Sequence, residues 1–228
     1  MSTSPGKGAH AGLVSSLVRQ GIMGRTSFAA AAMQKVDRAG YCPFGDPYED
    51  APQPIGHGQT ISAPHMHAHA LALLEPAISA AAKTKSTVRV LDVGSGSGYV
   101  TAALARLALV SGAHAVHVTG VEVIEELVEQ AKLSVFTADP DLASSVEFKK
   151  GDGWKGCPSD APYDAIHVGA AAEKFPLIIS EQLALGGRMI VPVGSGWDQT
   201  LVKCDKAEDG LKCEPVTGVL FVPLVKGA

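Results

Sequence analysis

The stretch Val88–Ala103 constrains the fold of this chain more than any other. Apolar residues at positions 88, 90, 91 and 93 form a short β-strand pattern, and three glycines follow at Gly94, Gly96 and Gly98. The next residues, Tyr99–Leu109, are compatible with a helix. A strand, a glycine-rich turn and a helix in this order are typical of the first unit of a doubly wound α/β domain.

The spacing of these glycines indicates the kind of ligand. A dinucleotide fingerprint reads G-x-G-x-x-G, whereas here Tyr99 stands where its third glycine would be. Asp92 lies two residues before the first glycine, and a carboxylate there would repel a pyrophosphate but suits a cationic amino acid end. The D-x-G-x-G-x-G pattern therefore resembles the first motif of class I S-adenosylmethionine (AdoMet) methyltransferases. A tight turn that holds no cofactor is the alternative interpretation.

Composition limits the class of protein. With 228 residues, 46% of them hydrophobic, the chain is long enough for one domain with a substantial core. A formal net charge of −4 disfavours a nucleic-acid binder, which usually carries a basic surface. No apolar run reaches the roughly 18 residues of a membrane span, and no signal-peptide pattern opens the chain. We therefore expect a cytoplasmic protein, and a monomer because no amphipathic seam stands out.

The four cysteines are Cys42, Cys157, Cys204 and Cys213, and none has C-x-x-C spacing. Scattered cysteines in a chain of this length favour reduced thiols over a zinc site or a disulfide framework.

We expect a single domain, 1–228, with three parts. Residues 1–8 are small and polar, which predicts disorder. Residues 9–82 contain expected helices at Ala11–Arg19, Ser27–Val36 and His65–Ala82, and the loop Gly40–Pro64 between the second and third. Because this loop is long and contains aromatic residues, it is expected to be ordered and functional. Residues 83–228 form the expected α/β core.

Apolar runs and helical patterns alternate within this core, as in βαβ units. After the first unit, strands are expected at Ala115–Val121, Val146–Lys149, Tyr163–Val168, Met189–Val193, Leu201–Asp205, Lys212–Thr217 and Val219–Pro223, and helices at Ile124–Phe136 and Phe175–Leu185. The second of these helices is expected to stop at Gly186–Gly187. Glu208–Gly210 is expected to form the turn of an antiparallel pair.

Acidic residues recur where the expected parallel strands end, which is where such sheets bind ligands. Glu122 lies 24 residues after Gly98, close to the roughly 20-residue offset at which an acid meets ribose hydroxyls. Asp152 lies between Gly151 and Gly153, which leave room for a flat base beside a carboxylate. A solvated acid and a plain Gly-Asp-Gly turn are the alternatives.

Thr60 and Ser62 fall just before the helix His65–Ala82. Hydroxyls at such positions commonly cap free helix amides. The same amides and the helix dipole also attract a carboxylate, so a binding role stays open beside the capping role.

Several segments together resemble one family. The segments GHGQTISAPHMHAHAL, LDVGSGSG, GDGW, APYDAIHVGAAA, LGGRMIVPVG and GVLFVPL, within about Leu13 to Val225, are similar to those of protein-L-isoaspartate O-methyltransferases. QTISAPHM is the specific part, since methyltransferases at large do not share it. The resemblance implies a Rossmann-like, mostly parallel sheet of the seven-stranded type, with antiparallel C-terminal strands and an N-terminal helical extension. It also implies methyl transfer from AdoMet to the free α-carboxylate of L-isoaspartyl and D-aspartyl residues in damaged proteins and peptides.

The resemblance further implies which residues form the site. AdoMet would be held by Gln59, Thr60, Ile61, Ser62, His67, Asp92, Gly94, Gly96, Ser97, Glu122, Val123, Gly151, Asp152 and Val225. Ser62 would be the active-site serine, and the substrate would contact Ile61, Ser62, Val222, Pro223 and Leu224. Val225 stands where many members of the family carry threonine, so the hydroxyl that they bring to the cofactor pocket is missing here.

The chemistry of such an acceptor agrees with this interpretation. An α-carboxyl group has a pKa of about 3.3–3.7 and is ionised at neutral pH, so no general base is required. The site has to align a carboxylate oxygen with the methyl group, and proximity accounts for much of such a barrier. We therefore expect Ser62 to orient the acceptor by a hydrogen bond rather than to act as a nucleophile.

The histidines do not predict a metal site. His65 and His67 do not share a helix face, and His65 and His69, which do, have no third ligand. His167 lies inside an expected strand and is expected to be packed or hydrogen-bonded there. Trp154 and Trp197 either pack or shape substrate pockets, and packing is the expected role.

Two other functions stay open. The chain could methylate another carboxylate or a small molecule, or it could be an inactive module that binds AdoMet or a peptide. A nicotinamide-dependent dehydrogenase is disfavoured by the glycine spacing.

Overall fold

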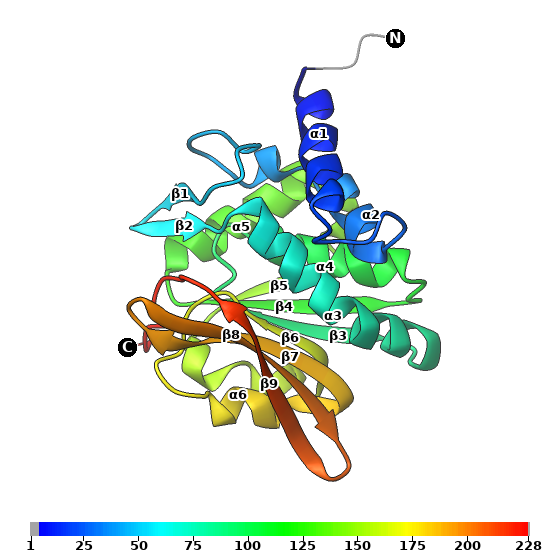
Figure 1. Cartoon of the computed structure of the whole chain (residues 1–228), viewed down its shortest axis with the longest axis vertical. Helices are drawn as coiled ribbons and strands as arrows, with labels where there is room; N and C mark the ends of the chain where they lie inside the picture. The colour runs from blue at the N-terminus through cyan, green and yellow to red at the C-terminus, as the bar shows by residue number, and fades with distance from the viewer. Residues whose placement is uncertain (1–4, 228) are drawn as a thin grey trace.

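The computed structural model describes residues 5–227 and consists of one large sheet, one small sheet and helices (Figure 1). The helices are α1 (Pro5–Arg19), α2 (Phe28–Lys35), α3 (Pro64–Thr84), α4 (Tyr99–Val110), α5 (Glu125–Ala138) and α6 (Leu177–Glu181), with short 3₁₀ turns η1 (Arg38–Gly40), η2 (Pro140–Leu142), η3 (Gly153–Lys155) and η4 (Pro158–Asp160). The strands are β1 (Gln53–Gly56), β2 (Gln59–Ile61), β3 (Val88–Val93), β4 (Val116–Glu122), β5 (Val146–Lys150), β6 (Tyr163–Val168), β7 (Leu183–Ser195), β8 (Asp198–Ala207) and β9 (Gly210–Gly218).

The large sheet has the order β5-β4-β3-β6-β7-β8-β9. The five strands from β5 to β7 are parallel, and β8 and β9 are antiparallel to their neighbours. From β3 the chain first builds outward through β4 and β5 and then returns to the other side of β3 with β6. This reversal places a topological switch point between β3 and β6, where open α/β sheets bind ligands. The expected doubly wound fold is confirmed.

The two faces of the sheet carry separate apolar cores. Val88 and Val90 on β3 pack into a large core shared with α1 to α5, whereas Leu91 and Val93 join a smaller core that includes residues of β6, β7 and α6. This division follows from the alternation of side chains along a strand. Figure 1 shows α6 on the opposite side of the sheet from α3 and α4. Among the residues described, no helix is both long and apolar enough to cross a membrane.

The N-terminal segment differs from the expectation. Helix α1 begins at Pro5, so part of the stretch that was expected to be disordered is helical, and residues 1–4 lie outside the described residues. The helix ends at Arg19 as expected, and Val14 and Leu17 are buried against the main core. Burial of Val14 and Leu17 stabilises this helix, because the small residues at its start contribute little helix stability of their own.

The expected loop at residues 40–64 contains a hairpin that sequence patterns did not reveal. Strands β1 and β2 pair antiparallel and are joined by His57 and Gly58, both with positive φ (53° and 69°). A two-residue hairpin loop favours such angles, which glycine adopts freely. Ile55 and Ile61 from the two strands are buried in the main core. The expectation that this segment is ordered is confirmed.

Helix α6 is shorter than the predicted helix Phe175–Leu185, and this part of the prediction is wrong. Only Leu177–Glu181 is helical, and β7 starts at Leu183, which pairs with Tyr163. The expected glycine stop therefore lies inside β7, where the pairing register shifts. Pairing with β6 overrides the local helical pattern because it satisfies backbone groups in a buried sheet.

The last expected strand, Val219–Pro223, is also wrong. This segment is irregular, and Pro223 makes only an isolated bridge with Ala171. The Gln199 side chain bonds the backbone of Phe221 instead, accepting from its N–H (2.7 Å) and donating to its carbonyl (3.1 Å). The segment is thereby held across the end of the sheet rather than within it.

Cys204 and Cys213 form a disulfide, which contradicts the expectation of reduced thiols. The two residues lie directly opposite each other in the β8–β9 ladder. The register follows from the turn, because Ala207 pairs with Gly210 across it. The expected turn at Glu208–Gly210 was therefore the signal that could have predicted this pair. Among the residues described, Cys42 and Cys157 are free and buried.

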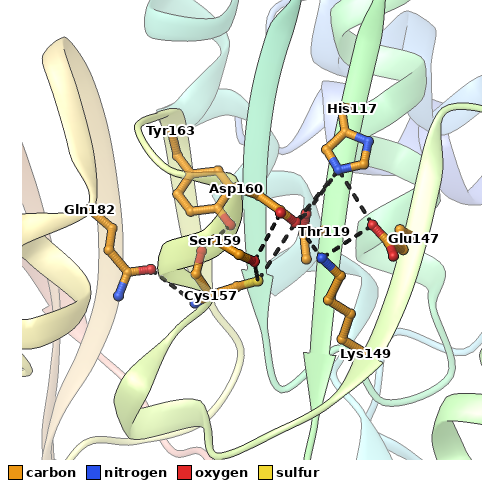
Figure 2. A network of polar contacts seen from close by, with 9 residues as sticks. All are labelled: His117, Thr119, Glu147, Lys149, Cys157, Ser159, Asp160, Tyr163 and Gln182. Carbon is orange, nitrogen blue, oxygen red and sulfur yellow. Dashed lines mark hydrogen bonds and ion pairs between the residues drawn. The ribbon is translucent and has the colours of Figure 1, made fainter.

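A network of ion pairs lies on the face of the large sheet that carries Leu91 and Val93 (Figure 2). Asp160 of η4 accepts hydrogen bonds from Lys149 on β5 (2.7 Å) and from Thr119 on β4 (2.9 Å). Burial acts to raise the pKa of Asp160, but these hydrogen bonds outweigh it and hold the pKa below its usual value. The network therefore ties the loop after β5 to the sheet.

The same network contains side chains of metal-ligating types. The Nε2 atom of His117 lies 3.7 Å from carboxylate oxygens of both Glu147 and Asp160. The Lys149 ammonium contacts both carboxylates, at 3.3 Å and 2.7 Å, and supplies the positive charge among them. We therefore describe this cluster as an ion-pair network and assign no metal to it.

Candidate active site

A cavity opens at the carboxyl ends of β3, β4 and β6. Open α/β sheets bind their ligands at this edge. The lining of the cavity comes from four distant parts of the chain: the β1–β2 hairpin, the turns after the three strands, η3 and the C-terminal segment. The lining residues are Ile55, Gln59, Thr60, Gly94, Gly96, Val121, Glu122, Val123, Ile124, Gly153, Gly169, Ala170, Val222, Pro223, Leu224 and Val225.

Glu122 is the charged residue of this lining, and the backbone holds it in place. One carboxylate oxygen accepts from the Gly96 N–H (3.1 Å), and the other accepts from the N–H groups of Val123 (2.8 Å) and Ile124 (3.1 Å). A carboxylate offers about four lone-pair sites, so at least one stays free for a ligand hydroxyl. Glu122 can therefore accept a hydrogen bond from a ligand hydroxyl without moving.

The glycine turn leaves its side of the cavity open. Gly94 and Gly96 have positive φ (76° and 52°), and a Cβ on Gly96 would lie 3.2 Å from Ile55 Cδ1. Gly98, at φ 87°, has another role, because a Cβ there would lie about 3 Å from Phe148 and Ala131. The first two glycines thus give the ligand access to the backbone, and the third lets α4 pack closely.

Asp92 is not among the residues that line the cavity, and its contact with the cofactor stays a prediction. Its carboxylate is buried and accepts from Thr101 Oγ1 (2.6 Å) and from His167 Nδ1 (2.7 Å). Asp92 and His167 are register partners on β3 and β6, so their side chains share a face. The expectation that His167 is a hydrogen-bonded sheet residue is confirmed. Asp92 fixes the start of α4 and the end of β6 beneath the site.

His67 is buried below the cavity and contacts Arg38, which is also buried. The Arg38 guanidinium donates from Nη1 to His67 Nδ1 at 3.2 Å, so the ring carries its proton on Nε2. Burial and the neighbouring positive charge hold the pKa of His67 well below its usual value. His67 is therefore a neutral Nε2–H donor. Sequence patterns gave no sign of Arg38 as its partner.

Asp152 and Gly151 lie behind the cavity wall. The Asp152 carboxylate accepts from the Trp154 N–H (3.0 Å) and so caps η3. The C-terminal segment covers it, since a Cβ on Gly227 would lie 3.0 Å from Asp152 Cβ. The Trp154 indole donates to the Leu224 carbonyl (2.9 Å) and fixes this segment. Gly153 lines the cavity, whereas Gly151 and Asp152 are not among its lining residues.

A second, wider cleft adjoins the first. Thr60, Gly169 and Val222 line both. Ser62 lines the second cleft only, and its hydroxyl takes part in no hydrogen bond with the residues described. The two hollows therefore meet at Thr60, Gly169 and Val222, with Ser62 in the lining of the wider one.

The capping role considered for Thr60 and Ser62 is wrong. Thr60 lies in β2, and the residue at the N-cap of α3 is Ala63, which has no side-chain bond to the helix. The Asp50 carboxylate instead accepts from the N–H of His65 (2.9 Å) and from its ring. Because Asp50 satisfies the helix end, the hydroxyl of Ser62 is free for a ligand.

Comparison with known proteins decides the family. The sequence model described as protein-L-isoaspartate(D-aspartate) O-methyltransferase matches residues 9–228. The chain belongs to this family. Protein-L-isoaspartate O-methyltransferase 2 of Arabidopsis thaliana is 42% identical over 227 residues, covering 96% of this chain and 69% of that protein. The protein-L-isoaspartate O-methyltransferase of Caenorhabditis elegans is 41% identical over 196 residues, covering 85% and 82%.

The structural comparison agrees. A protein-L-isoaspartate O-methyltransferase from Plasmodium falciparum, solved with S-adenosyl-L-homocysteine, has a TM-score of 0.83 at 32% identity. The match covers 96% of this chain and 99% of that one. This member of the isoaspartate methyltransferase family therefore has the fold of the family over almost its whole described length.

The lining can be compared with the residues that the family resemblance implied. Seven implied cofactor residues line the smaller cavity, namely Gln59, Thr60, Gly94, Gly96, Glu122, Val123 and Val225. Seven do not, namely Ile61, Ser62, His67, Asp92, Ser97, Gly151 and Asp152. Of the implied substrate residues, Val222, Pro223 and Leu224 line this cavity, Ser62 and Val222 line the wider cleft, and Ile61 is buried in the core.

Sequence analysis missed other lining residues. Gly169 and Ala170 follow β6 directly, and their small side chains leave room between the two hollows. The small-residue run at this strand end was the signal that could have identified them. Ile55 carried no such signal, because the β1–β2 hairpin brings it to the glycine turn only in the folded chain.

Proposed function

We propose that this chain transfers the methyl group of AdoMet to the free α-carboxylate of L-isoaspartyl and D-aspartyl residues in damaged proteins and peptides. The observation that carries the proposal is the meeting of two hollows at Thr60, Gly169 and Val222, with Ser62 in the lining of the wider one. The smaller hollow suits the cofactor, and the wider one suits a polypeptide.

The residues of the smaller hollow fit AdoMet. Gly94 and Gly96 leave the space that a close backbone approach requires, and Glu122 keeps an acceptor free for ribose hydroxyls. Gln59 and Thr60 close the hollow from the β2 side, and Val225 closes it from the C-terminal side. When bound, AdoMet supplies a sulfonium methyl group as the electrophile.

The wider cleft binds and orients the acceptor carboxylate. An acceptor α-carboxylate is already ionised at neutral pH, so the chain has to orient it rather than deprotonate it. Ser62 donates a hydrogen bond to one oxygen of this carboxylate. The other carboxylate oxygen then faces the smaller hollow. The transfer neutralises an anion and a cation, so a partly dry site favours it. Val222 supplies an apolar side chain where the two hollows meet.

Incubation with labelled AdoMet and matched peptides tests the proposal. The two peptides differ only in carrying isoaspartate or aspartate at one position. We expect labelling of the isoaspartyl peptide alone. Equal labelling would assign a different acceptor, and AdoMet binding without labelling of any isoaspartyl peptide would indicate an inactive binding module.

We also propose that the chain acts as a monomer, without nucleic acid, in the cytoplasm. The net charge of −4 supports the absence of a nucleic-acid partner. A cytoplasmic location predicts that the Cys204–Cys213 pair is reduced in cells, because disulfides persist mainly in oxidising compartments. Trapping of Cys204 and Cys213 thiols in cells tests the location.

A further inference from the structure

Trp197 is exposed in a way that packing within the chain does not explain. It leaves 91% of its surface accessible at the tip of the β7–β8 hairpin. Ser195 pairs with Asp198, so the hairpin loop consists of Gly196 and Trp197 alone. A Cβ on Gly194 would lie 1.9 Å from the Asp198 carbonyl oxygen, which shows how tightly the hairpin closes. The expected packing role of Trp197 is wrong.

The indole belongs to a larger apolar feature. Trp197, Leu220 and Phe221 line the wide cleft that contains Ser62, and they also line a neighbouring hollow of about 1,000 Å³. We call these three side chains the apolar ridge, because they separate the two hollows. Leu220 is 59% exposed. Large apolar side chains exposed together commonly mark a binding surface.

The backbone that carries the apolar ridge is held in place by hydrogen bonds within the chain. The buried Gln199 side chain donates from Nε2 to the carbonyls of Gly196 and Phe221, both at 3.1 Å. Its Oε1 accepts from the Phe221 N–H at 2.7 Å. One amide thus ties the hairpin loop to the C-terminal segment. A surface that is already ordered loses little conformational entropy on binding.

We propose that the apolar ridge binds the side chain next to the methylated residue of the substrate polypeptide, and so selects substrates with an aromatic or aliphatic neighbour. This rests on the proposed function. The occupant follows from continuity, because one cleft is lined by both Ser62 and Trp197. A polypeptide whose damaged residue reaches Ser62 continues along that cleft. Tryptophan is enriched among the residues that dominate binding energy, since it buries a large rigid surface.

The test measures kcat/KM for three isoaspartyl peptides that differ in the neighbours of isoaspartate. One has phenylalanine before it, one has phenylalanine after it, and one has glycine on both sides. We expect the wild type to prefer at least one phenylalanine peptide by about tenfold over the glycine peptide. Trp197→Ala should remove this preference through KM and change the glycine peptide less than twofold, and Trp197→Phe should keep most of it.

A control and a second readout separate the possible results. Phe136→Ala changes another aromatic residue, 70% exposed on α5 and outside both hollows, and should alter none of these values. Calorimetric titration of the peptides into protein saturated with S-adenosyl-L-homocysteine measures binding without turnover. Tighter binding of a phenylalanine peptide to the wild type only would support the ridge even if no peptide were methylated, a result that would contradict the proposed function alone.

Other results would overturn the proposal. Equal losses for all three peptides in Trp197→Ala, or no loss for any, would show that the ridge does not select the neighbouring side chain. If Trp197→Ala instead lowered the mass of the protein in light scattering, with peptide selectivity unchanged, the ridge would be a contact between copies of the chain.

Discussion

At the scale of a residue, the hydroxyl of Ser62 is the group that we propose to orient the acceptor carboxylate. This hydroxyl faces the wide cleft, and Asp50 rather than Ser62 satisfies the start of α3. Ser62→Ala should lower kcat/KM for an isoaspartyl peptide by about 10- to 100-fold, because a hydrogen bond to a charged group contributes about 1.5–3 kcal/mol. Binding of S-adenosyl-L-homocysteine, measured by calorimetry, should change no more than a few-fold.

Ser134→Ala, on α5, is the matched control for this change and should leave the kinetics intact. Unchanged methylation by Ser62→Ala would remove Ser62 from the mechanism.

His67 makes the stability of the folded chain depend on pH. Its pKa in the folded chain lies well below 6.5, so below that pH the unfolded chain binds a proton that the folded chain does not. Stability therefore falls as the pH drops below about 6.5. Urea unfolding of the wild type and of His67→Gln should show a flatter pH profile in the variant.

His114→Gln, at an exposed position, should leave the pH profile as it is in the wild type. An identical slope in His67→Gln and the wild type would show that another group is responsible.

At the scale of elements, the β8–β9 hairpin is the part that a covalent bond constrains. The Cys204–Cys213 disulfide closes a loop with a sequence separation of 9. Loop-closure entropy for about ten residues predicts that its loss lowers the free energy of unfolding by about 2–3 kcal/mol. For a chain of 228 residues this corresponds to a fall in Tm of roughly 5–10 °C.

Calorimetric scans with and without a reducing agent measure this difference. Cys204→Ala/Cys213→Ala should unfold at the lower temperature under both conditions. A wild-type Tm that does not respond to reduction would show that the disulfide contributes little to stability.

The elements that sequence patterns predicted well are those with their own local signal. Val88–Val93 and Tyr99–Val110 have an apolar run, a glycine turn and a helical pattern of their own, and both are found where expected. The predicted helix Phe175–Leu185 failed because the pairing of Leu183 with Tyr163 draws its end into β7. Strand pairing depends on residues far apart in sequence, so a local pattern does not reveal it.

At the scale of the whole molecule, binding in the smaller cavity should stabilise the fold. A ligand at 100 times its Kd adds about 2.7 kcal/mol to the free energy of unfolding. S-Adenosyl-L-homocysteine at that concentration should raise the Tm by roughly 5–10 °C in a thermal-shift measurement. Glu122→Gln should need a higher concentration for the same shift, because it weakens the acceptor for ribose hydroxyls.

Glu129→Gln, at an exposed position on α5, is the matched control for Glu122→Gln. The absence of any shift with the wild type would contradict the assignment of the smaller cavity to AdoMet.

The sequence alone indicated the fold class, because LDVGSGSG is contiguous and acts through local backbone geometry. It indicated the family through the resemblance that QTISAPHM carries. It also indicated Glu122, which stands at a fixed offset from the glycine turn. Only the tertiary structure decided that Asp92 bonds to His167 and that His67 bonds to Arg38. The two hollows, and the apolar ridge beside them, likewise join segments that are distant in the chain. Their meeting depends on packing and strand order, which no short stretch of sequence specifies.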